Sequence, residues 1–205
     1  MSVRPLERDT GPRTASALAR FERSFSYPLG PTGRFRIDHG EDYARFFHAM
    51  GEARCFVAEH AGKIGGVIAA AIRRVGLPDG TERDACYLGD LKIAPSLRGG
   101  RTLFELARNV RAWLPPSIVS AFAVVMDGTE LTPDRYTGRA GLPALSPVSN
   151  IVIARLDTGD PSLTRESDIT TSDSAAGLER FRTLSRGRYW THPADPRERS
   201  SFKPE

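Results

Sequence analysis

The chain has 205 residues, a mass of 22.5 kDa and a net charge of +4, and 40% of its residues are apolar. These values suit one domain of fair size, or a domain with a tail, and no run of 18 apolar residues is present to span a membrane. Nearly all the positive charge is arginine, scattered along the chain rather than clustered with aromatic residues, which argues against nucleic-acid binding.

The cysteines and histidines do not form a metal or disulfide pattern. Cys55 and Cys86 lie far apart in apolar stretches, so they are expected to be buried free thiols. The four histidines have no ligand spacing, so no metal is predicted. The opening stretch MSVRPLERDTGPR has no apolar core of a secretory signal, and a cytoplasmic location is the expectation.

The first fifty residues combine one short strand with two helices. Residues 2–6 fit a short edge strand, and apolar residues at helical spacing predict helices over 14–25 and 39–50. The segment 27–33 is rich in Pro and Gly and is interpreted as a connecting loop.

Three strands are then predicted, over 54–60, 63–75 and 85–93, joined by short turns. Strict alternation in the third strand would divide its side chains between two faces. One face would carry Tyr87, Gly89, Leu91 and Ile93, and the other would carry Leu88, Asp90 and Lys92.

The rest of the chain continues this mixture and then becomes polar. A helix over 101–114, a buried strand over 117–126, a short helix over 132–142 and a strand over 149–156 are expected. A Ser-, Thr- and Asp-rich linker and one more helix, over 178–190, follow. We therefore expect a main domain over 1–157 and a C-terminal extension over 158–205, and the order of elements predicts an α+β fold with a mixed sheet.

The segment between the third strand and the next helix has the composition of an anion-binding loop. The sequence SLRGGRT places two glycines and two arginines just before a helix N-terminus, where backbone N–H groups are unpaired. Glycine lets a backbone approach an anion closely, and arginine adds charged hydrogen bonds to phosphate oxygens. An ordinary tight turn is the alternative reading.

The stretch LKIAPSLRGGRTL resembles the central motif of the GNAT (Gcn5-related) N-acetyltransferases. Leu91, Ile93, Pro95, Arg98 and Gly99 match that motif. The resemblance covers about 2–157 and implies a central, mostly antiparallel sheet, flanked by helices and splayed between its fourth and fifth strands.

The resemblance also implies a cofactor and a reaction. Acetyl-CoA would lie in the splay, with its pantetheine arm paired to backbone near Leu91 and Ile93. Its pyrophosphate would lie on Arg98, Gly99, Gly100, Arg101 and Thr102. The acetyl group would pass directly to an amine.

Two side chains are candidates for the chemistry. Asp90 directly precedes Leu91 and would bind or deprotonate the amine, the alternative being an ion pair with Arg73 or Arg74. Tyr136, in the late short helix, would protonate the leaving thiolate, although it stands one residue out of the family's register.

The resemblance has departures that bear on activity. Arg101 replaces the motif's second glycine, and Leu103 replaces its third small residue. The sequence therefore predicts an N-acetyltransferase acting on a small-molecule or protein amine. The alternative is a catalytically degenerate module that binds CoA or a protein partner. No nucleic acid or membrane is expected as a partner, and a homodimer is left open.

Overall fold

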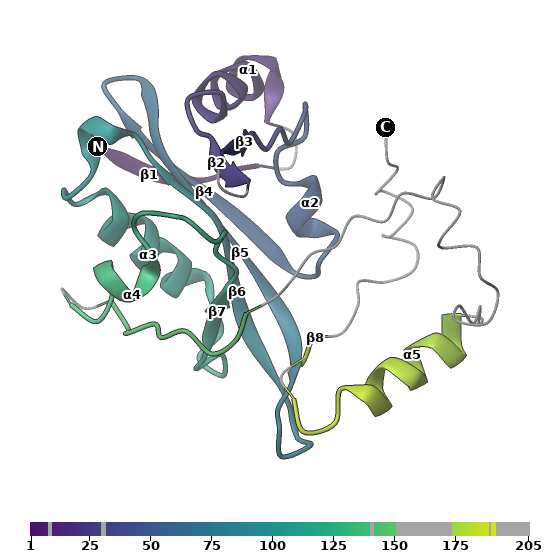
Figure 1. The fold of residues 1–205 in the computed structure, drawn as a ribbon. Coiled ribbons are helices and arrows are strands. Elements are labelled where there is room, and N and C mark those ends of the chain that lie inside the picture. Colours follow the sequence, from purple (N-terminus) through teal and green to yellow (C-terminus); the bar gives the residue numbers. More distant parts are fainter. Residues whose placement is uncertain (8–9, 30–31, 140–141, 151–173, 189, 192–205) are drawn as a thin grey trace.

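The structure, a computed structural model, describes residues 1–7, 10–29, 32–139, 142–150, 174–188 and 190–191 (Figure 1). The strands are β1 (Ser2–Pro5), β2 (Tyr27–Leu29), β3 (Gly33–Phe35), β4 (Ala53–His60), β5 (Lys63–Gly76), β6 (Glu82–Ile93), β7 (Ala121–Ala123) and β8 (Trp190–Thr191). The helices are α1 (Gly11–Glu22), α2 (Arg45–His48), α3 (Thr102–Trp113), α4 (Pro133–Tyr136) and α5 (Ser174–Leu184), with a 3-10 turn over Pro95–Leu97.

A central sheet organises the described residues in the order β1-β4-β5-β6-β7, and β8 pairs with the far end of β5. All neighbouring pairs are antiparallel except β6 and β7, which are parallel. This mixed sheet with flanking helices confirms the predicted α+β class. No helix among the described residues is long and apolar enough to cross a membrane.

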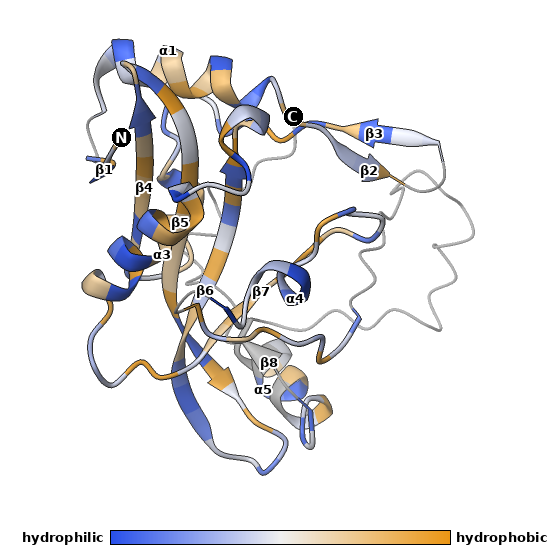
Figure 2. Cartoon of the chain, turned by 90° about the vertical axis from the view of Figure 1, so that its left-hand side faces the viewer, coloured by the Kyte–Doolittle hydropathy of each residue, from blue (hydrophilic) through white to orange (hydrophobic). Residues whose placement is uncertain are grey.

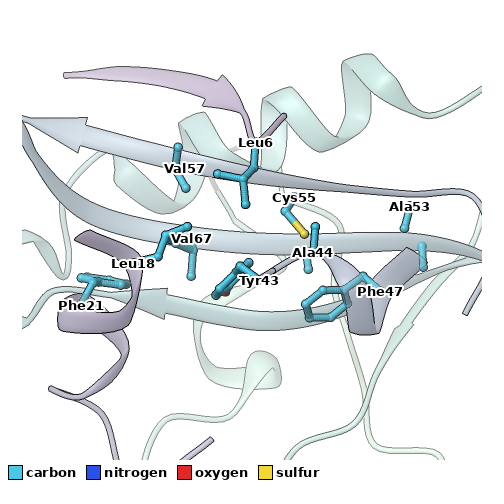
Figure 3. Close-up of a cluster of buried hydrophobic side chains, with 12 residues drawn as sticks. Leu6, Leu18, Phe21, Tyr43, Ala44, Phe47, Ala53, Cys55, Val57 and Val67 are labelled. Atoms are coloured by element: carbon cyan, nitrogen blue, oxygen red, sulfur yellow. The ribbon is translucent and has the colours of Figure 1, made fainter. Parts of the chain in front are cut away.

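The helices lie on both faces of the sheet, as Figure 1 shows, with α1 and α2 on one face and α3 on the other. On the first face, Leu18, Tyr43, Phe47 and Val67 belong to a buried cluster, drawn in Figure 3. On the second face, the fully buried Leu106 of α3 packs in a separate apolar cluster. Figure 2 shows hydrophobic colour along the middle of β4 and β5 and hydrophilic colour toward the β5–β6 turn.

The sheet splays between β6 and β7. Their parallel pairing covers only Cys86 with Ala121, Tyr87 with Phe122, and Leu88 with Ala123. The rings of Tyr87 and Phe122 lie 5.4 Å apart across this pair. Beyond Leu88, β6 continues to Ile93 without a described strand on that side, so the predicted splay is confirmed.

The predicted division of the β6 side chains between the two faces of the sheet is wrong, because β6 contains a bulge. Val67 pairs with Lys92 and Ala69 with Gly89, so two β6 residues, Asp90 and Leu91, stand opposite one β5 residue. Asp90 has a φ of +50°, in the left-handed region. The extra residue reverses the alternation. Leu91 and Ile93 therefore join Leu88 on the α3 face. Asp90 and Lys92 lie on the α1 face with Tyr87, and Asp90 contacts Tyr43 there.

Three other segments, one predicted loop and two predicted helices, also differ from the sequence prediction. Residues 27–35 form the hairpin β2–β3, with the rings of Tyr27 and Phe35 5.6 Å apart, where a plain loop was predicted. The sequence prediction missed these two strands because they are only three residues long and lie on either side of a Pro- and Gly-rich stretch. The helices predicted over 39–50 and 132–142 shrink to the short α2 and α4.

The C-terminal prediction is only partly covered. Helix α5 starts and ends earlier than the predicted 178–190. The strand β8 adds to the sheet next to Val75 and Gly76. The strand predicted over 149–156 and the linker after it lie mostly outside the described residues, so the division at 157 stays a prediction.

Candidate active site

A cavity of about 940 Å³ lies at the splay. Its floor is β6, where Tyr87, Leu88, Gly89, Asp90 and Leu91 line it. The other walls are Leu103 and Ala107 of α3, the segment 121–126, α4 with Tyr136, and the segment 35–47 that connects β3 to α2. The volume falls within the range of cofactor and ligand pockets, so this cavity is the candidate site.

Both predicted catalytic residues line this cavity. Asp90, Leu91 and Tyr136 all line it, although Tyr136 is 46 residues away from Asp90 in sequence. Ile93 lies beyond the lining residues, at the end of β6. Burial and then the charge of Asp134 raise the pKa of Tyr136, so its hydroxyl keeps its proton at neutral pH.

The predicted phosphate loop directly precedes α3. Gly99 has a φ of +74°, a conformation that favours glycine. Within the described part of the chain, no protein acceptor is assigned to the backbone N–H groups from Gly99 to Phe104. Six unpaired donors at the start of a twelve-residue helix form a concentrated positive region that suits an anion.

The two arginines of this loop are exposed to solvent. Arg98 makes only a 3.4 Å hydrogen bond from Nε to the carbonyl of Ile93. Arg101 is 83% exposed and pairs with Glu105 at 3.2 Å. Its φ of −75° is ordinary for any residue, so the backbone tolerates arginine where the GNAT motif has glycine. Thr102 differs, because it is buried and its hydroxyl faces Met1.

Asp90 belongs to a buried charged network rather than to an arginine pair. Its Oδ1 accepts a hydrogen bond from the ammonium of Lys92, and its Oδ2 accepts one from the hydroxyl of Tyr43. The predicted alternative partners lie elsewhere, since Arg74 pairs with Asp84 and Arg73 donates to the carbonyl of Met50. Asp90 therefore pairs within β6 and not with the neighbouring strand, and its role in the chemistry stays a prediction.

The network extends to α1 and to the segment before α2. Lys92 Nζ lies 3.0 Å from Glu22 Oε1, and the same oxygen lies 2.6 Å from His39 Nδ1. Burial lowers the pKa of Lys92, but Asp90, Tyr27 and Glu22 together raise it more, so the net shift is upward and the ammonium stays charged. Burial, with the charge of Asp90, also raises the pKa of Tyr43 well above its usual range, so Tyr43 remains a donor.

Sequence reasoning missed Glu22 and His39. They are 17 residues apart, one at the end of a helix and one in a connection, and neither belongs to a spacing motif. The one available signal was weak: Glu22 is a charged residue on the inner face of the amphipathic helix α1, where an apolar core residue is expected.

Comparisons with known proteins identify the fold. No family model and no curated protein sequence matches the chain. Among solved structures, the ribosomal-protein-alanine N-acetyltransferase from Brucella melitensis biovar Abortus 2308 aligns with a TM-score of 0.50. It is 14% identical and covers 75% of this chain and 98% of its own.

A second solved structure gives the same result. AAC(6')-Iy, in complex with the bisubstrate analog CoA-S-monomethyl-acetylneamine, aligns with a TM-score of 0.50 and 15% identity, over 76% of this chain and 97% of its own. Both proteins have the fold of the GNAT N-acetyltransferases. This chain therefore has a divergent form of the GNAT fold, as its central motif predicted.

Proposed function

We propose that the protein is an acyl-CoA-dependent N-acyltransferase that moves an acetyl group from acetyl-CoA to an amine. The observation that carries the proposal is the cavity at the β6–β7 splay, with a helix N-terminus rich in unpaired N–H groups on the same strand–loop–helix unit. The two similar structures support this proposal, because both are N-acetyltransferases and one of them holds a CoA-based bisubstrate analog.

In this proposal the loop and the strand edge hold acetyl-CoA. The N–H groups and arginines of Arg98–Thr102 bind the pyrophosphate through charged hydrogen bonds. The open edge of β6 at Leu91 and Ile93 offers backbone groups to the pantetheine arm, because no described strand pairs with it there. Leu91 and Leu103 supply apolar contacts on the cavity wall.

Two cavity residues act on the reacting groups. Asp90 carries a negative charge at the cavity wall and attracts the acceptor's ammonium form. Its carboxylate oxygens already accept bonds from Lys92 and Tyr43, which favours a binding role over proton abstraction. The Tyr136 hydroxyl protonates the leaving thiolate, since burial raises the pKa of this phenol and it therefore holds a proton that it can give.

Calorimetry with acetyl-CoA, followed by thiol release with a panel of amines, tests the proposal. Binding with turnover of at least one amine supports it. Binding without turnover of any amine would overturn the enzymatic assignment in favour of a CoA-binding module. Absence of binding would overturn both.

A further inference from the structure

Besides Asp90 and Tyr136, the polar side chains that line the cavity include the imidazole of His39. His39 lines the cavity from the segment between β3 and α2. Its Nδ1 donates a 2.6 Å hydrogen bond to Glu22 Oε1, and both side chains are buried, with 8% and 4% of their surfaces exposed. Since Glu22 holds the proton on Nδ1, the ring nitrogen left as a base is Nε2.

Aromatic neighbours fix the plane of this imidazole. The ring of Phe47 stacks on it with centroids 5.7 Å apart, and the ring of Tyr43 lies 4.6 Å away. Phe46 closes a third side, with an edge contact at 6.4 Å. Within the described ranges no protein group bonds to Nε2. The imidazole is therefore held rigidly, with one basic nitrogen unused on a cavity wall.

The charges around His39 oppose a metal site and favour a base. Glu22, His39 and Asp90 offer donor atoms within 4.8 Å of one another, a spacing that suits a cation. The Lys92 ammonium contacts both carboxylates and takes that place. Two carboxylates against one ammonium leave one net negative charge on the Glu22, Asp90 and Lys92 side chains, next to the imidazole.

We infer that His39 is the general base of the transfer and that Glu22 positions it; the inference rests on the proposed function. The amine nitrogen bonds to the thioester carbonyl carbon, and the C–S bond breaks. The ammonium form of the acceptor gives one proton to His39 Nε2 before the attack. After the attack the thiolate takes the proton of Tyr136, and the second N–H proton of the amine restores the Tyr136 hydroxyl. This arrangement of a base oriented by a carboxylate follows the general logic of catalytic His–acid pairs.

Steady-state kinetics with the best amine of the panel test the role of His39. His39→Gln should lower kcat about 100-fold or more, the usual contribution of a general base, with acetyl-CoA affinity unchanged. His60→Gln is the matched control, because His60 is exposed at the end of β4 and away from the cavity. Imidazole added to His39→Ala should restore part of the activity. Full activity in His39→Gln would overturn the inference.

Matched substitutions test the role of Glu22. Glu22→Gln keeps the side-chain length but removes the carboxylate that accepts the Nδ1–H bond, so kcat should fall while the KM for acetyl-CoA stays unchanged. Glu22→Asp keeps a carboxylate and should retain more of the activity. A kcat in Glu22→Gln equal to that of the wild type would reduce Glu22 to a structural role.

A nitrogen-15 NMR spectrum of His39 tests the Glu22–His39 pair independently of turnover. A failure to turn over any amine would defeat the proposed function and the role of base with it, whereas the spectrum reports the tautomer of His39 directly. A proton held on Nδ1 in the wild type, and a mixture of both tautomers in Glu22→Gln, support the positioning of His39 by Glu22. A proton on Nε2 in the wild type would overturn it.

Discussion

Asp90 combines a backbone conformation and a charge that few residues could supply together. Its φ of +50° lies in the left-handed region, which Asp and Asn tolerate better than most residues because of their short polar side chains. The bulge at Asp90 turns its carboxylate into the network with Lys92 and Tyr43. Backbone strain and local electrostatics therefore constrain the same position.

Asp90→Asn separates the charge from the conformation. The amide tolerates the left-handed backbone but carries no negative charge, so turnover at neutral pH should fall while acetyl-CoA affinity stays nearly unchanged. Asp127→Asn is the control, since Asp127 is exposed and does not line the cavity. Kinetics and calorimetry on both variants check this. An equal loss of acetyl-CoA binding in Asp90→Asn would show that Asp90 only holds the strand in place.

Lys92 compensates two buried carboxylates. Its side chain is 1% exposed, and it contacts both Glu22 and Asp90. Lys92→Met keeps the aliphatic length but leaves two buried carboxylates without the ammonium that compensates their charge, so the free energy of unfolding should drop by about 3–5 kcal/mol. Lys63→Met, at an exposed strand end, should change it little. Urea unfolding of both variants measures the difference, and equal midpoints would contradict the network's structural importance.

At the scale of elements, the loop and helix α3 act as one unit. The helix dipole, the unpaired N–H groups and the arginines point to the same anion, and a single glycine, Gly99, makes the turn. Arg98→Ala should weaken CoA binding by about 1.5–3 kcal/mol, the value of a charged hydrogen bond. Arg111→Ala, at the other end of α3, is the matched control for calorimetry. Unchanged affinity in a folded Arg98→Ala would remove the loop from the binding site.

Arg101 tests whether the departure from the GNAT motif helps or obstructs binding. Its exposed pair with Glu105 contributes about 0–1 kcal/mol, and Arg108 also contacts Glu105, so the side chain is released toward a phosphate at little cost. Arg101→Gly should therefore bind CoA more weakly in calorimetry at low salt. Tighter binding by Arg101→Gly would mean that the side chain blocks the site.

The elements that the sequence predicted well are those whose signal is local. The long apolar strands β4 and β5 and the helix α3 carry their own periodicity, and they were found in place. The facing of β6 was mispredicted, because the bulge at Asp90 depends on a register with β5 that alternation alone does not show.

The candidate site was predictable only where a motif marked it. The loop before α3 carried the GNAT pattern, and Tyr136 followed from the order of elements. The Glu22–His39 pair joins the end of α1 to a connection 17 residues later, and Glu22 also contacts Lys92 of β6, 70 residues away. A contact made by tertiary packing leaves no spacing signal in one sequence.

On the scale of the whole molecule, a net charge of +4 coexists with a buried acidic pair on one side of the sheet. The side chains of Glu22 and Asp90 are each 4% exposed, and Asp90 lines the cavity. In the proposed function, the carboxylate of Asp90 would attract a cationic acceptor inside the cavity although the chain as a whole is positive.

The ionisation of Glu22 should make the stability of the whole fold sensitive to acid. Burial raises the pKa of Glu22, but the hydrogen bond and charge of His39 and the Lys92 ammonium outweigh it, so the net shift is downward from 4.5. A folded-state pKa below the unfolded one means that the stabilisation is complete above about pH 4.5 and is lost as the pH falls through the folded value. Urea unfolding from pH 7 to pH 3 should show this loss, and it should be smaller in Glu22→Gln, which starts less stable at pH 7. Glu52→Gln, at an exposed position, should follow the wild-type curve. Parallel curves for the wild type and Glu22→Gln down to pH 3 would show that this ion pair contributes nothing to the acid sensitivity.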